Sequence, residues 1–476
     1  MPNNPAIAVE PRFFFLMPVW GERYIEYLLT FGLPTLLAPN NLPWLPNRAV
    51  SQFTFLTRAE DEKPIRASKL FAKLEALIPV KFILLDFYEG DRQEKFDQLG
   101  NGLKRGANEA LGRGFCMFCQ PDSIYSDGMV KHLYGVARSG KKACVTHGPS
   151  AALERIVPYL RERNLLTFDE VNPLASRVLA RALLDNQHPD EAGHCMGHPH
   201  YPVNPYMGFW RSPMLDGALY RFVSLHPFLV DLSHLSQVIN FSAIDHDFIR
   251  AHEFTWSDVH VETDSDNILV INVKPENERN VVLNPEITLD PVNHLARALY
   301  QSSNCHYSRF CFFHGLKVHT GDLDRDWHKF EDANLKWLNR NTSAILVATI
   351  VNANVNAKGV ASPLFQAETF WYYLRLIVST RKKFVRYAVS EHRPVEALKY
   401  SVNVLRKLVR IIFKILAKSF RVGARRRNIS PLIAPELRTV CEPAGEVTTD
   451  ASLPIAPAFC AVCRPDARRC VSDDRC

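Results

Sequence analysis

The first 150 residues alternate between short apolar runs typical of strands and segments with helical periodicity, and this alternation limits the possible folds more than any other feature. The runs predicted as strands are residues 13–19, 53–57, 80–86, 114–119 and 142–146. The segments predicted as helices between them are residues 22–31, 64–78, 101–111 and 128–138. Strand and helix alternating over this length predict a parallel α/β sheet with helices on its faces, in which ligands bind at the carboxyl ends of the strands.

The rest of the chain divides by composition and periodicity. Residues 150–190 are predicted to be mostly helical, residues 194–232 are rich in Pro, His and Gly, and residues 268–273 are predicted to form a strand. Further helices are expected over residues 285–335, 365–389 and 396–420. We therefore predict four regions: an α/β domain at 10–150, a continuation of that fold at 151–360, a helical basic segment at 361–427, and a disordered, Cys-containing tail at 428–476.

Positive charge is concentrated near the C-terminus. Residues 381–427 hold 15 Lys and Arg against two acids, a local charge of +13 in a chain whose formal net charge is +7. Within residues 396–427, Leu405, Leu408 and Ile412 fall on one helical face, and Lys407 and Arg410 fall on another. This pattern predicts an amphipathic helix that lies on an anionic membrane surface, with a core-packed helix as the alternative. No recognised nucleic-acid motif accompanies the charge, so no nucleic-acid partner is expected.

The stretch from Leu103 to Val145 is the most informative part of the sequence. It reads as a helix, Gly114, an apolar strand, then Gln120-Pro121-Asp122-Ser123, and a second acid, Asp127, before Gly128 and a new helix. This order resembles nucleotide-sugar glycosyltransferases of the GT-A type, in which a buried strand ends in a short acidic D-x-D-like motif. The resemblance covers residues 10–150 and implies a GT-A-like mixed sheet with flanking helices. Here the first acid of the motif is replaced by Gln120.

The resemblance also implies where a nucleotide-sugar would bind. Asp122 would hold a divalent cation, Mn²⁺ or Mg²⁺, because hard oxygen ligands suit these ions and the leaving diphosphate needs its charge neutralised. The alternative for Asp122 and Ser123 is a turn that caps the next helix. The residues implied to bind the donor, from the ends of the predicted strands, are Trp20, Thr57, Arg58, Asp86, Asp122, Ser123 and Asp127.

Two acidic pairs later in the chain are candidates for a catalytic base. Asp245 and Asp247 flank a histidine, and Asp264 and Asp266 form a literal D-x-D before the strand predicted at 268–273. A carboxylate of either pair can deprotonate an acceptor hydroxyl or ligate a cation. Both pairs are also ordinary turn sequences, since Asp side chains bond their own backbone.

Histidines and aromatic residues gather between residues 188 and 226. His194 and His198 have the spacing of a zinc site, but Gly193, Gly197 and Pro199 forbid the regular helix that such a site needs, so a loop beside an active site is expected. Aromatic faces with polar tips bind sugars, and the residues predicted to bind an acceptor in this way are Trp210, Arg221 and His226. The four tail cysteines from Cys460 onward lack zinc-ribbon spacing.

These features lead to one function and two alternatives. The chain is predicted to be a glycosyltransferase of the hexosyltransferase type that moves a sugar from a nucleotide-sugar donor to a surface-glycan or lipid-linked acceptor. No apolar run is long enough for a spanning helix and no signal peptide precedes Pro18, so the expected location is cytoplasmic, at the inner face of the plasma membrane. The alternatives are a non-catalytic glycan- or nucleotide-binding protein tethered to the membrane, and a metal-dependent hydrolase. The P-loop, dinucleotide and serine-hydrolase motifs are absent from the sequence.

Overall fold

The structure is a computed structural model. It describes residues 10–337, apart from 89–91, 197, 199–200, 203–204, 213–214, 224, 238–247, 250–251, 253, 256, 280–311 and 313. The elements below belong to one compact unit that reaches Asn334. Within the described part of the chain, no helix is both long enough and apolar enough to cross a membrane. The predicted basic segment at 361–427 and the tail at 428–476 lie outside the described residues.

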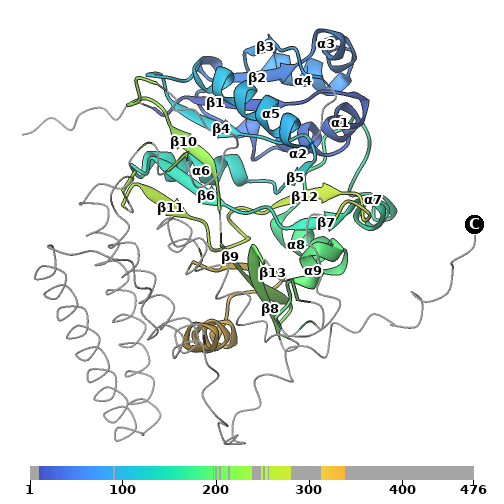
Figure 1. Ribbon diagram of the computed structural model, residues 1–476, viewed down its shortest axis with the longest axis vertical. Helices are drawn as coiled ribbons and strands as arrows, with labels where there is room; N and C mark the ends of the chain where they lie inside the picture. Colours follow the sequence, from blue (N-terminus) through green and yellow to red (C-terminus); the bar gives the residue numbers. More distant parts are fainter. Residues whose placement is uncertain are drawn as a thin grey trace, which may run out of the picture. The chain divides into compact units, whose positions relative to one another are not determined.

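A seven-stranded sheet in the order β11-β6-β10-β4-β1-β2-β3 forms the centre of this unit (Figure 1). Its strands are β1 (Phe13–Pro18), β2 (Gln52–Thr57), β3 (Val80–Leu84), β4 (Phe115–Phe118), β6 (Ala143–Thr146), β10 (His226–Asp231) and β11 (Val259–Val261). β10 runs antiparallel to both of its neighbours, β4 and β6, and the other pairs are parallel. The mixed α/β sheet with flanking helices is thus confirmed.

Helices cover both faces of the sheet, which explains why its strands are apolar at nearly every position. The side chains of Phe13 and Phe15 belong to one core with residues of α4 (Lys69–Leu77) and α6 (Met129–Arg138). Alternate residues face the other side, where α5 (Arg92–Ala107) packs against β1 and β2. A Cβ atom at Gly106 of α5 would lie only 3.0 Å from the Leu16 methyl groups, so this glycine allows the helix to approach the sheet closely.

The helices between the strands differ in extent from the sequence prediction. The helix predicted at 22–31 continues as α1 (Glu22–Tyr27), a π-helical turn η1 (Leu28–Gly32) and α2 (Leu33–Leu36), followed by the short turns η2 (Leu42–Trp44) and η3 (Arg48–Val50). The helix predicted at 64–78 is two helices, α3 (Ala59–Arg66) and α4, because the Ser68 hydroxyl accepts hydrogen bonds from the Leu70 and Phe71 N–H groups and starts a new helix. The boundaries predicted for the helix at 101–111 are also wrong, since α5 spans residues 92–107.

Two small sheets complete the unit. The first contains β5 (Ser123–Tyr125), β12 (Val270–Lys274) and β7 (Ser150–Ala152), and the second contains β13 (Leu316–His319), β9 (Gly217–Phe222) and β8 (Met207–Ser212). The remaining helices are α7 (Leu153–Glu162), α8 (Ser176–Asp185), α9 (Pro189–Gly193) and one over residues 325–337. The strand predicted at 268–273 is β12, whereas β8, β9 and β10 lie in a region that was predicted only as rich in Pro, His and Gly.

The strand order places a topological switch point between β1 and β4. From β1 the chain adds β2 and then β3 on one side, and it returns through α5 to add β4 on the other side. In open α/β sheets, ligands bind outside the carboxyl ends of the two strands that flank such a point. The residues that follow β1 and β4 are therefore the first place to look for a functional site.

Candidate functional site

The turn after β1 is built around Gly21. Its φ of 82° lies in the left-handed region that favours glycine. The Gly21 N–H donates to Asp61 Oδ2 at 2.9 Å, and Arg58 donates to both oxygens of the same carboxylate at 2.6 and 3.1 Å. Arg58, which was predicted to bind the donor, therefore positions the turn from which α1 begins.

The turn after β4 is held against β12. The Gln120 N–H donates to the Tyr125 hydroxyl at 2.7 Å, and that hydroxyl donates to the Gln120 carbonyl at 2.8 Å. The Val273 N–H donates to the Asp122 carbonyl at 2.8 Å, and the Ser123 hydroxyl donates to Asn272 Oδ1 at 2.9 Å. Asp122 is thus fixed at the carboxyl end of β4, beside the end of β12.

The carboxyl group of Asp122 lies among charges of both signs. Burial raises the pKa of Asp122 to about 6, although Arg23 and Lys274 act in the opposite direction. Arg23 is itself paired with Glu278 at 2.6 Å, and Glu278 also favours the protonated form of Asp122. A desolvated carboxyl group at a topological switch point is a candidate for binding a ligand.

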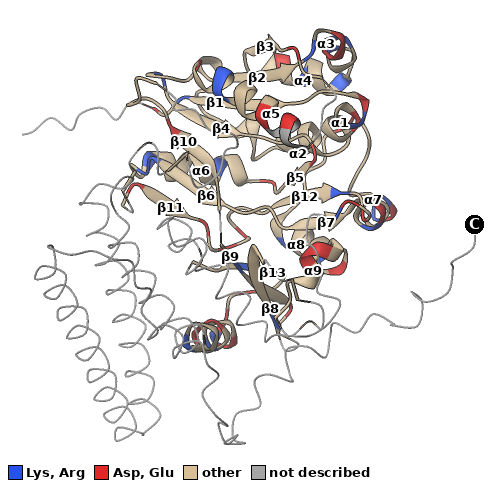
Figure 2. Ribbon diagram, in the orientation of Figure 1, with Lys and Arg blue, Asp and Glu red and all other residues tan. Residues whose placement is uncertain are grey.

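Lys274, the last residue of β12, is paired with an acid of α9. We call Asp122, Asp190, Glu191 and Lys274 the β12-end cluster. Lys274 Nζ lies 3.3 Å from Asp190 Oδ2, and the Asp190 side chain is fully buried. In Figure 2 the end of β12 is blue and α9 is largely red. The positive charge of Lys274 also lowers the pKa of Asp122 and of Glu191, against the larger effect of burial.

Glu191 is a fully buried carboxyl group with one oxygen hydrogen-bonded and the other not, in the part of the chain that the structure describes. Its Oε1 atom accepts a hydrogen bond from the Ser150 N–H at 2.9 Å, whereas its buried Oε2 atom has no hydrogen-bond partner among the described residues. Burial raises the pKa of Glu191 to about 7, against the lowering effects of the Ser150 hydrogen bonds and Lys274. A carboxyl group with a pKa near neutrality suits proton transfer at physiological pH.

The residues of the β12-end cluster also define what cation the site can take. Asp122 supplies a single carboxylate. In the described part of the chain, it does not belong to any group of three or more His, Cys, Asp or Glu side chains that lie close enough together to bind a metal ion. One protein carboxylate is enough for Mg²⁺ or Mn²⁺ when the phosphates of a substrate supply further oxygens. The donor set at Asp122 therefore fits a cation that arrives with a diphosphate.

Four other residues predicted to bind the donor differ in their exposure and in their contacts. The Trp20 ring stacks on Phe87 with 4.1 Å between ring centroids, at the carboxyl ends of β1 and β3. Thr57 is buried, and its hydroxyl has no hydrogen-bond partner among the described residues. Asp86 is exposed, and Asp127 accepts two hydrogen bonds from Asn40 at 2.8 and 2.9 Å.

The acids predicted as the base do not join the β12-end cluster. Asp264 and Asp266 precede β12, whereas Asp122 pairs with the far end of that strand, and a strand rises about 3.3 Å per residue. Asp264 contacts His319 at 2.9 Å, and Asp266 receives hydrogen bonds from Arg177. Asp245 and Asp247 lie outside the described residues.

The residues predicted to bind an acceptor belong to β8, β9 and β10. Trp210 is buried, and the fully buried Arg221 donates to Asn334 Oδ1 at 2.6 Å and to the Phe312 carbonyl at 3.3 Å. Burial lowers the pKa of Arg221 to about 10. His226 is exposed at the start of β10, with its ring 6.2 Å from that of His147.

The neighbouring histidines bond to the backbone. His188 Nε2 lies 2.9 Å from the Pro275 carbonyl, and His194 Nδ1 lies 2.6 Å from the Asp190 carbonyl. Neither histidine belongs to a possible metal-binding group in the described part of the chain. These two rings flank the short helix α9, which carries Asp190 and Glu191.

Three residues of the β12-end cluster were missed from the sequence. Asp190 and Glu191 follow Pro189 at the start of a short helix, a position where acids also stabilise the helix dipole. Lys274 ends an apolar strand without any motif around it. Only the pairing of β12 with β5 and β7 brings these residues together, and that pairing has no local signature.

Comparisons with known proteins give weak likenesses. No protein-family model matches the chain, and no curated protein matches it. Among solved structures, the chain is similar to a putative glucose-1-phosphate thymidylyltransferase from Bacillus anthracis, at 15% identity over 30% of this chain and 58% of that one, with a TM-score of 0.22. It is similar to mouse xyloside xylosyltransferase 1, at 12% identity over 32% and 59% of the two chains, with a TM-score of 0.21.

A third solved structure matches over a longer range. The mannosyltransferase PcManGT from Pyrobaculum calidifontis, in complex with GDP-Man and Mn²⁺, is 12% identical over 82% of this chain and 88% of that one, with a TM-score of 0.28. The matches to the first two proteins span less than two thirds of their length. Likenesses with TM-scores this low establish no relationship, so the function is inferred from the residues of this chain.

Proposed function

We propose that this chain is a glycosyltransferase that binds a nucleotide-sugar at the carboxyl ends of β1 and β4. The observation that carries the proposal is the β12-end cluster, in which the charge of Lys274 acts on Asp122 and Glu191 near the topological switch point. A sugar transfer needs a group that neutralises the leaving diphosphate and a base that activates the acceptor. Both kinds of group are present here.

Each residue of the cluster has a distinct role in this proposal. Lys274 supplies positive charge to the diphosphate, and Trp20 with Phe87 provides an aromatic face for the nucleobase. Asp122 would hold a divalent cation, which neutralises phosphate charge when bound. Glu191 takes the proton from the acceptor hydroxyl at its Oε2 atom, and this role requires the buried atom to become accessible when the substrates bind. Asp190 positions Lys274 through their ion pair.

The finer parts of the proposal come from the sequence. A hexose donor, a surface-glycan or lipid-linked acceptor, and attachment to the membrane through residues 396–427 are proposed on the basic amphipathic pattern and on the GT-A resemblance. The same patterns underlie the proposed cytoplasmic location at the plasma membrane.

The first test is donor binding by the full chain, measured as a shift in unfolding temperature with nucleotide-sugars, with and without Mn²⁺. A ligand at 100 times its dissociation constant stabilises the folded state by about 2.7 kcal/mol. We expect stabilisation of the wild-type chain, loss of the Mn²⁺-dependent part in Asp122→Asn, and wild-type behaviour in Glu75→Gln, an exposed residue of α4. We also expect Asp122→Asn to lower the transfer rate about 100-fold.

The outcomes separate the proposal from its alternatives. Binding without transfer to any acceptor would favour the non-catalytic binding protein. The absence of any shift with every nucleotide-sugar would contradict the donor site.

A further inference from the structure

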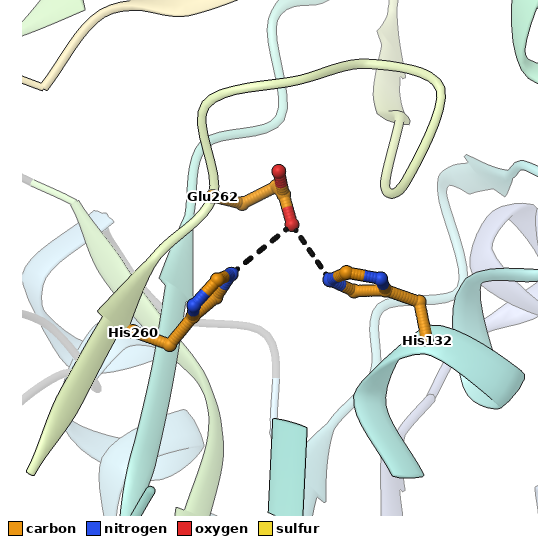
Figure 3. Close-up of side chains that lie close together, drawn as sticks. All are labelled: His132, His260 and Glu262. Atoms are coloured by element: carbon orange, nitrogen blue, oxygen red, sulfur yellow. Dashed lines mark hydrogen bonds and ion pairs between the residues drawn. The ribbon is translucent and has the colours of Figure 1, made fainter. Parts of the chain in front are cut away.

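A second cluster of polar side chains lies at the edge strand β11. His132 comes from α6, His260 from β11, and Glu262 directly follows β11 (Figure 3). Glu262 Oε2 lies 2.9 Å from His132 Nε2 and 3.3 Å from His260 Nε2. The three ligand atoms all lie within 4.8 Å of one another. Residues 128 positions apart in the chain are thus brought to one point.

The glutamate of this cluster is held in place by its other oxygen. Glu262 Oε1 accepts hydrogen bonds from the Thr263 and Asp264 N–H groups, both at 2.9 Å, and from Asn267 Nδ2 at 3.3 Å. The side chain is only 2% exposed. The Oε2 atom is therefore directed at the two imidazole rings, and the outer hydrogen bonds that orient a metal-ligating carboxylate are already present.

The two histidines contact Glu262 Oε2 in different ways. His260 Nε2 forms a hydrogen bond with this oxygen at 3.3 Å, whereas the buried His132 Nε2 lies 2.9 Å from it as an ion-pair contact. Around a tetrahedral ion with ligands at about 2.0–2.1 Å, neighbouring ligand atoms lie about 3.3 Å apart. The distance from His260 to Glu262 matches this spacing, and the distance from His132 to Glu262 is shorter by about 0.4 Å.

We infer that His132, His260 and Glu262 bind one divalent transition-metal ion, for which Zn²⁺ is the best match. Two imidazoles and one carboxylate are a ligand set of borderline softness that suits Zn²⁺ better than Mg²⁺ or Ca²⁺. The ion links α6 to the short edge strand β11. This site is separate from the β12-end cluster and does not depend on the proposed function.

Three protein ligands leave a position on the ion for water or a small ligand. An open pocket of about 520 Å³ is lined by His132 and His260 together with Lys131, Ser139 and Asn267. Solvent in this pocket can therefore supply the fourth ligand.

The neighbouring group of Asp264, Asp266 and His319 is a weaker candidate. The guanidinium of Arg177 donates to both oxygens of Asp266 at distances of 2.9 to 3.2 Å. The charge of this carboxylate is therefore already paired with the positive charge of Arg177. His319 Nδ1 contacts the Gly321 carbonyl. His319→Asn is consequently a matched control for the loss of a nearby histidine.

The test counts bound zinc in the full chain. Wild type, Glu262→Gln, His260→Asn and the control His319→Asn are stripped with EDTA, freed of EDTA, saturated with Zn²⁺, separated from unbound metal and analysed for zinc. We expect Glu262→Gln and His260→Asn each to bind one equivalent less than the wild type and the control. Zinc bound by other parts of the chain contributes equally to the wild type and both ligand variants and cancels between them, and the control shows what the loss of His319 alone removes.

Unfolding temperatures distinguish loss of the site from loss of the fold. The substitution Glu262→Gln keeps a carbonyl oxygen for the Thr263 and Asp264 N–H groups, so this variant is expected to unfold cooperatively without metal. Zn²⁺ should raise the unfolding temperature of the wild type more than that of Glu262→Gln. Equal zinc content in the wild type and both ligand variants would overturn the inference.

Discussion

Glu191 shows how the surroundings of one residue convert an ordinary acid into a reactive group. One carboxylate oxygen is held by the Ser150 N–H, and the other is buried without a hydrogen-bond partner in the described part of the chain. Burying a charge without a close partner is costly, so the protonated form is favoured. The same burial that makes Glu191 a suitable base also makes it a source of instability above neutral pH.

This cost predicts a pH-dependent effect of Glu191→Gln. Burial raises the pKa of Glu191 from 4.5 to about 7, so the folded state binds more protons than the unfolded state between these values. The free energy of unfolding therefore falls as the pH rises through this window. The variant keeps an acceptor for the Ser150 N–H but has no charge, so it should be more stable than the wild type by about 2 kcal/mol at pH 8.

Urea unfolding of both proteins at about pH 5 and pH 8 checks this prediction. The stability difference should be small at the lower pH and large at the higher one. The same difference at both pH values would show that Glu191 does not titrate in this range. Glu191→Gln should also abolish transfer while donor binding persists, which separates the base from the donor site.

At the scale of elements, glycines mark where strands and helices approach most closely. Gly114 precedes β4, and a Cβ atom there would lie 2.5 Å from the Arg12 carbonyl. The Arg12 carbonyl also accepts a hydrogen bond from the Phe115 N–H at 2.8 Å. This hydrogen bond joins β4 to the residue that precedes β1. A side chain at position 114 must therefore disturb the centre of the sheet.

Two substitutions of the same kind should have opposite effects. We expect Gly114→Ala to lower the free energy of unfolding by about 1–3 kcal/mol, since backbone must move. At Gly135, inside α6, an added Cβ would have no neighbouring atom within 4 Å. Gly135→Ala should therefore raise the free energy of unfolding by about 0.5–1 kcal/mol, because alanine has the higher helix propensity. Denaturant unfolding of the two variants and the wild type measures both changes. A destabilised Gly135→Ala would contradict the open space at this position.

Local patterns predicted the strands that are rich in apolar residues. β1 and β4 are buried on both faces and read as continuous apolar runs, whereas β2 and β6 also contain buried threonines. β10 was not predicted as a strand, because Pro227 lies within it and proline is rare in central strands. The structure accommodates Pro227 at a register irregularity between Pro227 and Leu229. Asp122 could be placed from its position after an apolar strand, but its neighbours Lys274 and Glu191 depend on long-range pairing that no local pattern encodes.

At the scale of the whole molecule, the central sheet draws strands from distant parts of the chain. β10 and β11 come from residues after 220, yet β10 lies between β4 and β6, which come from the first 150 residues. The predicted boundary at residue 150 therefore falls between strands of one sheet.

A fragment of residues 1–150 should consequently fail to fold. Without β10 and β11, one edge of β4 and both edges of β6 are left open. We expect this fragment to be insoluble or to lack a cooperative unfolding transition, whereas a fragment of residues 1–337 should unfold cooperatively. Circular dichroism during heating distinguishes the two outcomes. Cooperative unfolding of the shorter fragment would show that residues 10–150 are an independent domain.

The position of β10 also has a consequence for synthesis on the ribosome. About 80 residues separate Thr146 from His226, and translation adds about 5–20 residues per second, so several seconds pass after β6 emerges before β10 is available. Contacts between residues far apart in the chain also form slowly. During this interval the nascent chain exposes an apolar strand edge at β4, and a chaperone that shields it would raise the yield of native protein.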